Sequence, residues 1–247
     1  MFNFFAKENC LNNNVYLISG SDYNHIKNVL RMKEGETFLV SYNGKSDLCE
    51  IEKFENDTVF AKIIEEDYNN TTLPVKIYLF QGLPKSDKME LIIQKAVELG
   101  VQEIVPVEMK RCVVKIEDKK KAQKAARWQS IAESAAKQSK CNFVPKVNEI
   151  LSYKQALLKA KELDLLLVPY ENEEGMNATK EALKEINKPM SVGVIIGSEG
   201  GFEESEIELA KQSGAKIISL GKRILRTETA AITTLSMLML HSEMNIK

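Results

Sequence analysis

Short runs of alternating hydrophobic and polar residues dominate the first 72 residues of the chain. This period of two predicts half-buried β-strands. Asn43-Gly44 separates two of the runs and is the commonest signal for a two-residue hairpin turn. A helical pattern at 22–32 interrupts the strands. The predicted strands occupy residues 15–19, 37–42, 48–54 and 58–65. Many short strands with a single helix indicate a small β-barrel over residues 1–72.

The pattern changes after a polar linker at 65–74, which ends in Pro74. From there on, nearly all-apolar runs alternate with helical patterns, and this alternation is typical of a parallel sheet covered on both faces. One such helix is predicted at 87–100, where Gly100 is placed to end it. The predicted strands occupy 75–81, 103–107, 165–169, 192–197 and 216–220. The sequence thus predicts an α/β domain over residues 73–247.

Composition narrows the class of protein. The chain is 44% hydrophobic and 28% charged, with a net charge of −1, so any surface that binds nucleic acid must be local. No apolar run approaches the roughly 20 residues that span a bilayer, and the first residues do not resemble a signal peptide. Four scattered cysteines and only two histidines, His25 and His241, argue against a metal site or a histidine-based triad. We expect a cytoplasmic protein without a metal or membrane partner.

A glycine-rich turn follows the predicted strand at 192–197. Its glycines at 197, 200 and 201 fit neither of the two common nucleotide-binding motifs. The next helix begins with acidic residues, which the helix dipole favours and which neutralise the positive end that a pyrophosphate needs. The acids of this region are Glu199, Glu203, Glu204 and Glu206. The turn therefore favours a neutral or cationic ligand, and a tight turn without a ligand is the alternative.

The last predicted strand is followed by GKRILRTETAA, residues 221–231. Thr227 and Thr229 are candidate helix caps, and the small residues after them allow a ligand or another chain to approach closely. Two arginines flank Ile224-Leu225, a pair expected to be buried. A basic loop before a core helix is the alternative interpretation.

These two segments resemble the C-terminal signature of SPOUT-class RNA methyltransferases, and within that class the RsmE family, which methylates N3 of a uridine in 16S rRNA of the small ribosomal subunit. HIKNVLRMKEGE, KMELIIQKAVELGV and RWQSIAESAAKQS also match, so the resemblance covers nearly the whole chain. It implies an α/β SPOUT domain with a parallel sheet and a deep trefoil knot, preceded by a PUA-like β-barrel that binds RNA. It further implies a homodimer and S-adenosylmethionine, bound in the knot, as the methyl donor.

The resemblance also implies roles for individual residues. Arg226 is expected to stabilise negative charge on the uracil, while Glu228 or Glu199 takes the N3 proton or orients the arginine. The implied cofactor-binding residues are Val168, Pro169, Gly197, Ser198, Glu199, Gly200, Leu220, Gly221, Ile224, Leu225 and Arg226. The chain departs from the family at Ser198, where proline is usual, and at Asn3 and Lys140, where arginine is usual.

The strongest local positive charge lies between residues 110 and 127. By itself such a run indicates a solvated helix face, whereas in an RNA enzyme it would bind phosphates. His25 is expected to pack or cap rather than to catalyse. The predicted RNA-binding residues are Arg31, Lys33, Arg111, Lys115, Lys119, Lys120, Lys124, Arg127 and Lys140.

Three alternatives stay open at this point. Another SPOUT enzyme could modify a ribose 2′-hydroxyl or a tRNA base. A non-catalytic rRNA-binding ribosome-assembly factor could keep the fold without methyl transfer. A nucleotide-dependent α/β enzyme would bind ATP or NAD instead of S-adenosylmethionine.

Overall fold

The computed structural model describes residues 1–7, 10–85, 87–173 and 175–246. The chain divides into two compact units, Met1–Thr72 with Ala136–Val144, and Leu73–Ala135 with Pro145–Lys247. The segment 136–144, which the sequence placed in the second domain, thus groups with the N-terminal unit. Buried polar contacts explain this grouping, because Asn3 Nδ2 donates to the Cys141 carbonyl over 3.0 Å and Asn142 Oδ1 accepts from the Thr71 N–H over 2.8 Å. Such long-range bonds leave no periodic signal in the sequence.

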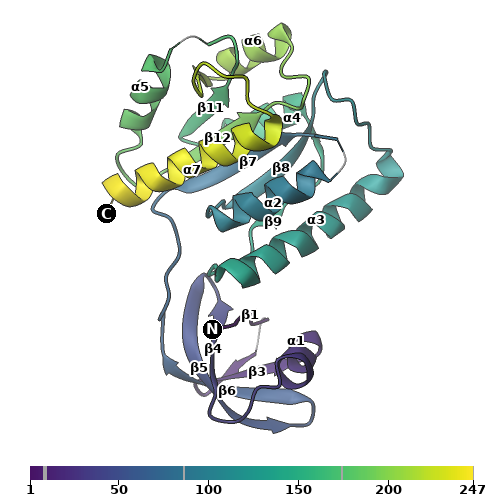
Figure 1. Ribbon diagram of the computed structural model, residues 1–247, viewed down its shortest axis with the longest axis vertical. Coiled ribbons are helices and arrows are strands. Elements are labelled where there is room, and N and C mark those ends of the chain that lie inside the picture. The colour runs from purple at the N-terminus through teal and green to yellow at the C-terminus, as the bar shows by residue number, and fades with distance from the viewer. Residues whose placement is uncertain (8–9, 86, 174, 247) are drawn as a thin grey trace. The chain divides into compact units, whose positions relative to one another are not determined.

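The N-terminal unit is built on a six-stranded sheet with the order β1-β4-β5-β6-β3-β2 (Figure 1). β1 runs parallel to β4, and the other pairs are antiparallel. The predicted hairpin is confirmed, since Asn43 and Gly44 join β4 to β5 with φ values of 49° and 78°. The strands are β1 (Asn3–Phe5), β2 (Leu11–Asn12), β3 (Val15–Ser19), β4 (Thr37–Tyr42), β5 (Lys45–Glu55) and β6 (Thr58–Glu65).

The predicted helix of this unit begins as α1 (Ser21–Asn24) and continues as a short π-helix, η1 (His25–Val29). Ile26 is fully buried in the core of the sheet. His25 presents its ring edge to Phe4 at 5.8 Å, which agrees with a packing role.

The C-terminal unit contains a parallel sheet with the order β10-β8-β7-β12-β11-β13, and β9 pairs with β8 beside that path (Figure 1). Its central strands are buried nearly throughout, as their apolar sequences predicted. The strands are β7 (Lys76–Gly82), β8 (Glu103–Glu108), β9 (Lys146–Val147), β10 (Leu151–Ser152), β11 (Leu165–Pro169), β12 (Ser191–Ile196) and β13 (Lys216–Ile218).

Helices cover both faces of this sheet, which confirms the predicted α/β architecture. α4 and α6 pack into one core cluster with the strands, whereas α2 and α7 pack against each other and α7 contacts β7 and β12. The helices are α2 (Lys88–Glu98), α3 (Asp118–Ser139), α4 (Tyr153–Ala160), α5 (Asn177–Glu185), α6 (Glu204–Gln212) and α7 (Thr227–Asn245). Within the described ranges, no helix is both long and apolar enough to cross a bilayer.

Candidate active site

A cavity of about 890 Å³ lies where β11, β12 and β13 end. Open parallel sheets bind ligands beyond the carboxyl ends of their strands, because the loops there are free to vary. The loops after these three strands supply most of the lining, and α2 and α7 supply the rest. The structure brings together at this cavity most of the residues predicted to bind a cofactor: Pro169, Gly197, Ser198, Glu199, Leu220, Gly221, Ile224, Leu225 and Arg226.

Two predicted cofactor residues are not among those that line the cavity. Val168 is fully buried in the core of the sheet. Gly200 packs against Arg111 instead, where a Cβ on Gly200 would come within 2.8 Å of the Arg111 carbonyl oxygen. Because Gly200 has no side chain, the backbone of Arg111 can pack closely against the turn at this position.

The turn after β12 is held in one conformation by hydrogen bonds. The N–H of Gly201, which has a φ of 67°, donates to the Ser198 carbonyl over 2.9 Å. Ser198 is 5% exposed, and its hydroxyl donates to the Arg111 carbonyl over 3.1 Å. The serine found in place of the family's usual proline thus ties the turn to the neighbouring segment.

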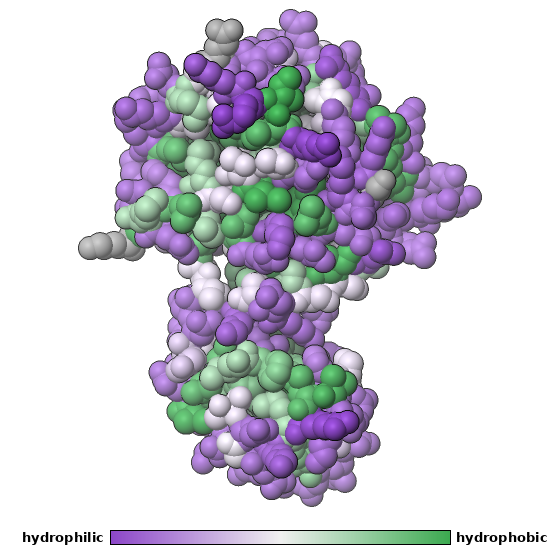
Figure 2. All heavy atoms as spheres, in the orientation of Figure 1, coloured by the Kyte–Doolittle hydropathy of each residue, from purple (hydrophilic) through white to green (hydrophobic). Residues whose placement is uncertain are grey.

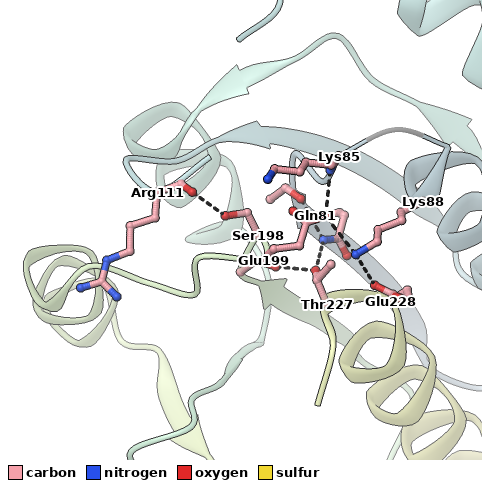
Figure 3. A network of polar contacts seen from close by, with 10 residues as sticks. Gln81, Lys85, Lys88, Arg111, Ser198, Glu199, Thr227 and Glu228 are labelled. Atoms are coloured by element: carbon pink, nitrogen blue, oxygen red, sulfur yellow. Dashed lines mark hydrogen bonds and ion pairs between the residues drawn. The ribbon is translucent and has the colours of Figure 1, made fainter. Parts of the chain in front are cut away.

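A buried polar chain connects β7, the turn and α7 (Figure 3). Gln81 Nε2 donates to the Thr227 hydroxyl over 2.9 Å, and this hydroxyl donates to the Gly197 carbonyl over 2.6 Å. The same nitrogen also donates to the Gly82 carbonyl. Because a carbonyl oxygen can only accept, the Gly82 and Gly197 carbonyls at the two ends of the chain fix the direction of every hydrogen bond between them. Gln81 was not predicted as a site residue, although a polar residue at the end of an apolar strand is a signal that could have selected it, and it is fully buried here.

The expectation that Thr227 or Thr229 caps α7 is wrong. The N-cap residue is Arg226, and no side chain makes a capping hydrogen bond there. The Thr227 hydroxyl instead donates to the Gly197 carbonyl, 30 residues away in the sequence, and so it does not cap the helix.

Two carboxylates and one lysine meet next to the cavity, where Lys88 and Glu199 line it and Glu228 is not among the lining residues (Figure 3). Lys88 Nζ lies 3.1 Å from Glu199 Oε1 and 3.4 Å from Glu228 Oε2. The Lys85 backbone N–H also donates to Glu199 Oε1, over 2.9 Å. In the described part of the chain neither carboxylate pairs with Arg226, so their expected role in orienting it is replaced by a contact with Lys88.

Burial raises the pKa of Glu199, but the backbone hydrogen bonds from Lys85 and from its own N–H, with the nearby Lys88 ammonium, outweigh it and hold this pKa below the usual range. The hydrogen bond to Glu199 raises the pKa of Lys88, with Glu228 adding to the effect, although partial desolvation opposes it. Glu199 and Lys88 are therefore in forms that attract one another at neutral pH.

The N-terminus of α6 is occupied by its own acidic residues. Glu206 is 2% exposed, and its carboxylate accepts from the Glu203 N–H and the Lys110 N–H, each over 2.9 Å. Lys110 Nζ lies 2.7 Å from the Glu203 carboxylate. A phosphate would have to displace these groups, which agrees with the prediction that this helix end does not bind one.

The loop after β13 forms a more open wall. Ile224 is 85% exposed, so the expectation that it is buried is wrong. The reversal has a local cause, since Gly221 has a φ of 101° and the loop then runs along the rim of the cavity. Arg226 is also exposed and lines the cavity. This wall thus presents hydrophobic and cationic groups to solvent.

The loop after β11 contributes residues that the sequence analysis did not select. Glu171 and Glu173 line the cavity together with the hydrophobic side chains of Met176 and Phe202. The Glu171 carboxylate lies against the turn. A Cβ placed on Gly201 would be 3.4 Å from Glu171 Oε1. Their position just after a strand of the parallel sheet is the signal that could have selected them. No cluster of three or more metal-ligating side chains occurs among the residues that the structure describes.

The predicted RNA-binding residues of the C-terminal unit are exposed, and several have acidic neighbours. Lys119 and Lys120 both approach Glu117, at 3.2 and 3.5 Å. Arg127 Nε lies 2.8 Å from Glu90. Exposed pairs of this kind contribute little stability, so phosphates can exchange with the acids. The other members of the predicted set in this unit, also exposed, are Arg111, Lys115 and Lys124.

In the N-terminal unit, Arg31, Lys33 and Lys140 are all exposed. Arg31 and Lys140 adopt left-handed backbone conformations, with φ values of 54° and 59°. Asn3, found where the family usually has arginine, is 4% exposed and accepts from the Ser41 hydroxyl. It therefore supports the unit from inside and does not reach solvent.

Comparison with known proteins identifies the family. Residues 71–239 match the family described as RNA methyltransferase domain, and residues 18–64 match the RNA methyltransferase PUA domain. Ribosomal RNA small subunit methyltransferase E of Bacillus subtilis (strain 168) is 38% identical over 233 residues, which cover 93% of this chain and 91% of that protein. The chain belongs to the ribosomal RNA small subunit methyltransferase E family.

Solved structures of relatives agree with this assignment. A ribosomal RNA small subunit methyltransferase E from Neisseria gonorrhoeae, bound to S-adenosyl methionine, has a TM-score of 0.82 and 31% identity, with 97% of each chain covered. A Legionella pneumophila methyltransferase in complex with the same cofactor has a TM-score of 0.81 and 33% identity, with 96% of each chain covered. The predicted family, the α/β architecture and the PUA-like domain are confirmed. The trefoil knot stays a prediction, because strand pairing alone does not trace a thread through a loop.

Proposed function

We propose that this protein transfers a methyl group from S-adenosylmethionine to N3 of a specific uridine in 16S rRNA of the small ribosomal subunit. The observation that carries the proposal is the cavity at the ends of β11, β12 and β13, which is lined both by the glycine turn and by Ile224, Leu225 and Arg226. Family membership and two relatives with a bound cofactor support it.

The residues at the cavity fit this cofactor. The volume of about 890 Å³ falls within the range of small-ligand sites. Glu171 and Glu173 suit a cationic ligand, and Phe202, Ile224 and Leu225 supply apolar surface for an adenine ring. When bound, the sulfonium group supplies the methyl group that is transferred.

The chain's own residues would prepare the nucleophile. Uridine N3 carries an imide proton, so a base must remove it before the nitrogen can react. Glu228 or Glu199 would accept this proton, and Arg226 would stabilise the negative charge left on the uracil oxygens. Correct orientation alone is worth roughly 7–11 kcal/mol, so residues that fix the geometry matter as much as the base. The target base would have to leave its stack to reach the cavity.

Further parts of the proposal concern partners. The PUA-like unit and the basic residues between 110 and 127 would bind rRNA. Exposed hydrophobic side chains over α2 and α7 would form the interface of a homodimer (Figure 2), and Leu91, Leu240 and Met244 there are 41%, 48% and 73% exposed. Light scattering that finds a monomer at working concentration would contradict the dimer. A cytoplasmic location follows from a ribosomal substrate.

The decisive experiment incubates the protein with unmodified small subunits and S-adenosylmethionine labelled in its methyl group. Nucleoside mass spectrometry should find the label as 3-methyluridine, and nuclease mapping should place it at one position. A ribose methyl would favour a 2′-O-methyltransferase instead. No transfer, combined with no cofactor binding by calorimetry, would favour a ribosome-assembly factor.

The RNA-binding role of the basic segment has its own test. Replacing Lys119, Lys120 and Lys124 with alanine should weaken rRNA binding and flatten its dependence on salt, because fewer counterions are released. A matched control replaces Lys180, Lys184 and Lys188, which are equally exposed on and just after α5. Equal losses in both triple variants would mean that only net charge matters, and the segment would then have no special role.

A further inference from the structure

Lys88 occupies a position that the proposed mechanism does not yet use. It is the first residue of α2, and its ammonium lies between the carboxylates of Glu199, from the turn after β12, and Glu228, from the first turn of α7. The three side chains are 27%, 23% and 15% exposed. They come from three separate segments, so their convergence is a product of the fold and not of local helix spacing.

The arrangement solves an electrostatic problem. Two carboxylates that share a site repel each other, and without a cation one of them retains a proton, which means that its pKa rises. Lys88 is the ammonium that separates them. Other charged groups on the surrounding elements include Lys85 and Asp87 before α2, Glu90 in its first turn, and Arg226 before α7. Lys85 contributes its backbone N–H to Glu199, and no carboxylate contact to the Arg226 side chain occurs in the described residues.

Glu228 is the carboxylate with spare capacity. Its Oε2 atom is buried and has no hydrogen-bond partner among the described residues, and the only group that faces it closely is Lys88 Nζ, at 3.4 Å. Glu199, by contrast, already accepts from Lys85 and lies closer to the lysine. Replacing Lys88 would therefore leave this buried oxygen without the cation beside it, which is costly for an ionised group.

We propose that Lys88 is a positioning residue that keeps Glu199 and Glu228 both ionised beside the cavity, so that one of the two carboxylates can accept the N3 proton of the target uridine. This inference rests on the proposed function. In the step itself the N–H bond breaks, its electron pair stays on N3, and the proton forms an O–H bond on the carboxylate. Lys88 does not touch the substrate, and it acts through the two acids.

The first test measures the carboxylates directly, in the protein without substrate. Glutamate labelled with ¹³C at the carboxyl carbon reports each pKa by NMR, with E199Q and E228Q to assign the signals. In the natural protein Glu199, of these two carboxylates, should have a pKa below the ordinary range of a glutamate. In K88M one of them should rise by about one pH unit or more, and K88R should restore it. An unchanged titration in K88M would overturn the proposal.

The second test uses the reaction. Single-turnover methyl transfer by K88M should lose rate as the pH falls, because the shared proton occupies the base, and K88R should recover the natural pH profile. K95M is the matched control. Lys95 lies on the same helix, its Nζ is 2.8 Å from the Glu98 carboxylate, and neither residue is among those that line the cavity. A loss of rate that is equal at every pH and is not rescued by K88R would show a merely structural lysine.

The two tests separate the inference from the function on which it rests. If the natural protein methylates no rRNA, the proposed function fails, whereas the NMR titration still decides whether Lys88 controls the two acids. Thermal unfolding of K88M, with K95M for comparison, checks that the variant is folded. If K88M is unfolded, K88Q at the same position is titrated in its place.

Discussion

The two walls of the cavity differ in how firmly they are held. The turn after β12 is fixed from all sides, since Ser198 bonds to the Arg111 carbonyl, the Gly197 carbonyl accepts from Thr227, and Glu199 is held by α2. The loop after β13 is held mainly at its first residue, where the Ser219 carbonyl accepts from the Thr179 hydroxyl over 2.7 Å and the Ser219 N–H donates to the same hydroxyl over 3.1 Å. Further along, the Gly221 N–H donates to the Ser219 hydroxyl over 3.2 Å, and Ile224 is 85% exposed.

This difference indicates that the turn after β12 positions a ligand, whereas the loop after β13 contacts it. A catalytic site needs groups held within a fraction of an ångström, and such precision requires a second layer of hydrogen bonds. The turn has that layer. The loop instead presents its side chains to solvent, where a ligand or substrate can cover them. Substitutions in the turn should therefore damage folding and binding together, while substitutions in the loop should damage function alone.

The largest functional effect is expected at Arg226, on the open wall. R226A should lower methyl transfer by about 100-fold or more, because the negative charge that forms on the uracil loses its partner. Cofactor affinity, measured by calorimetry, should change by only a few fold, and the thermal midpoint should not move. R226K keeps the charge without the planar fork and should lose less. Turnover equal to that of the natural protein would remove Arg226 from the mechanism.

The largest effect on stability is expected at Gly82, beneath the turn. A Cβ there would come within 2.7 Å of the Ser198 backbone nitrogen and 2.8 Å of Met109 Sδ. G82A should destabilise the protein by roughly 1–3 kcal/mol in chemical denaturation and should weaken cofactor binding, since the backbone of the turn must shift. G193A is the control, because the nearest atoms to its Cβ would be the ends of two leucine side chains at 2.8 and 2.9 Å and the Phe80 ring at 3.4 Å, and none of these is backbone. If G82A and G193A lose equal amounts of stability and cofactor affinity, the turn is no more constrained than the rest of the core.

Local patterns in the sequence predicted most of the longer strands and the hairpin turn, and they placed both loops at strand ends, because hydrophobic periodicity is a property of neighbouring residues. They did not predict the short strands β1, β2, β9 and β10, which have two or three residues each and are too short to show a period. They did not predict what comes together in space. Lys88 contacts Glu199 of the turn, and Gln81 contacts Thr227, which in turn bonds to Gly197; both partners are more than 100 residues away in the sequence. The prediction that Ile224 is buried was wrong for a different reason. Its apolar side chain predicted burial, whereas the loop that follows Gly221, which has a positive φ, lies at the rim of the cavity. The glycine turn itself was recognised because its residues are adjacent.

A smaller effect is expected from the hydrogen bond that joins the turn to α7. T227V keeps the shape of the side chain but leaves the Gly197 carbonyl and one Gln81 N–H without their partner. The cost should be about 1–3 kcal/mol in the free energy of unfolding, measured by urea denaturation. T229V removes an exposed hydroxyl on the same helix and should cost far less. If the two variants are equally stable, the buried chain contributes nothing to holding the turn.

The smallest effect is expected at Ile224, and it sharpens the comparison between the walls. Because this side chain is 85% exposed, I224A should leave the free energy of unfolding within about 0.5 kcal/mol of the natural value. A ligand that covers the side chain would lose roughly 1–2 kcal/mol of binding free energy, so cofactor affinity should fall by about five- to 30-fold. L158A is the matched control, because Leu158 on α4 is 64% exposed and is not among the residues that line the cavity. Equal cofactor affinity in the two variants would show that the open wall does not contact the cofactor, and Ile224 would then belong to the surface that meets RNA or a second copy of the chain.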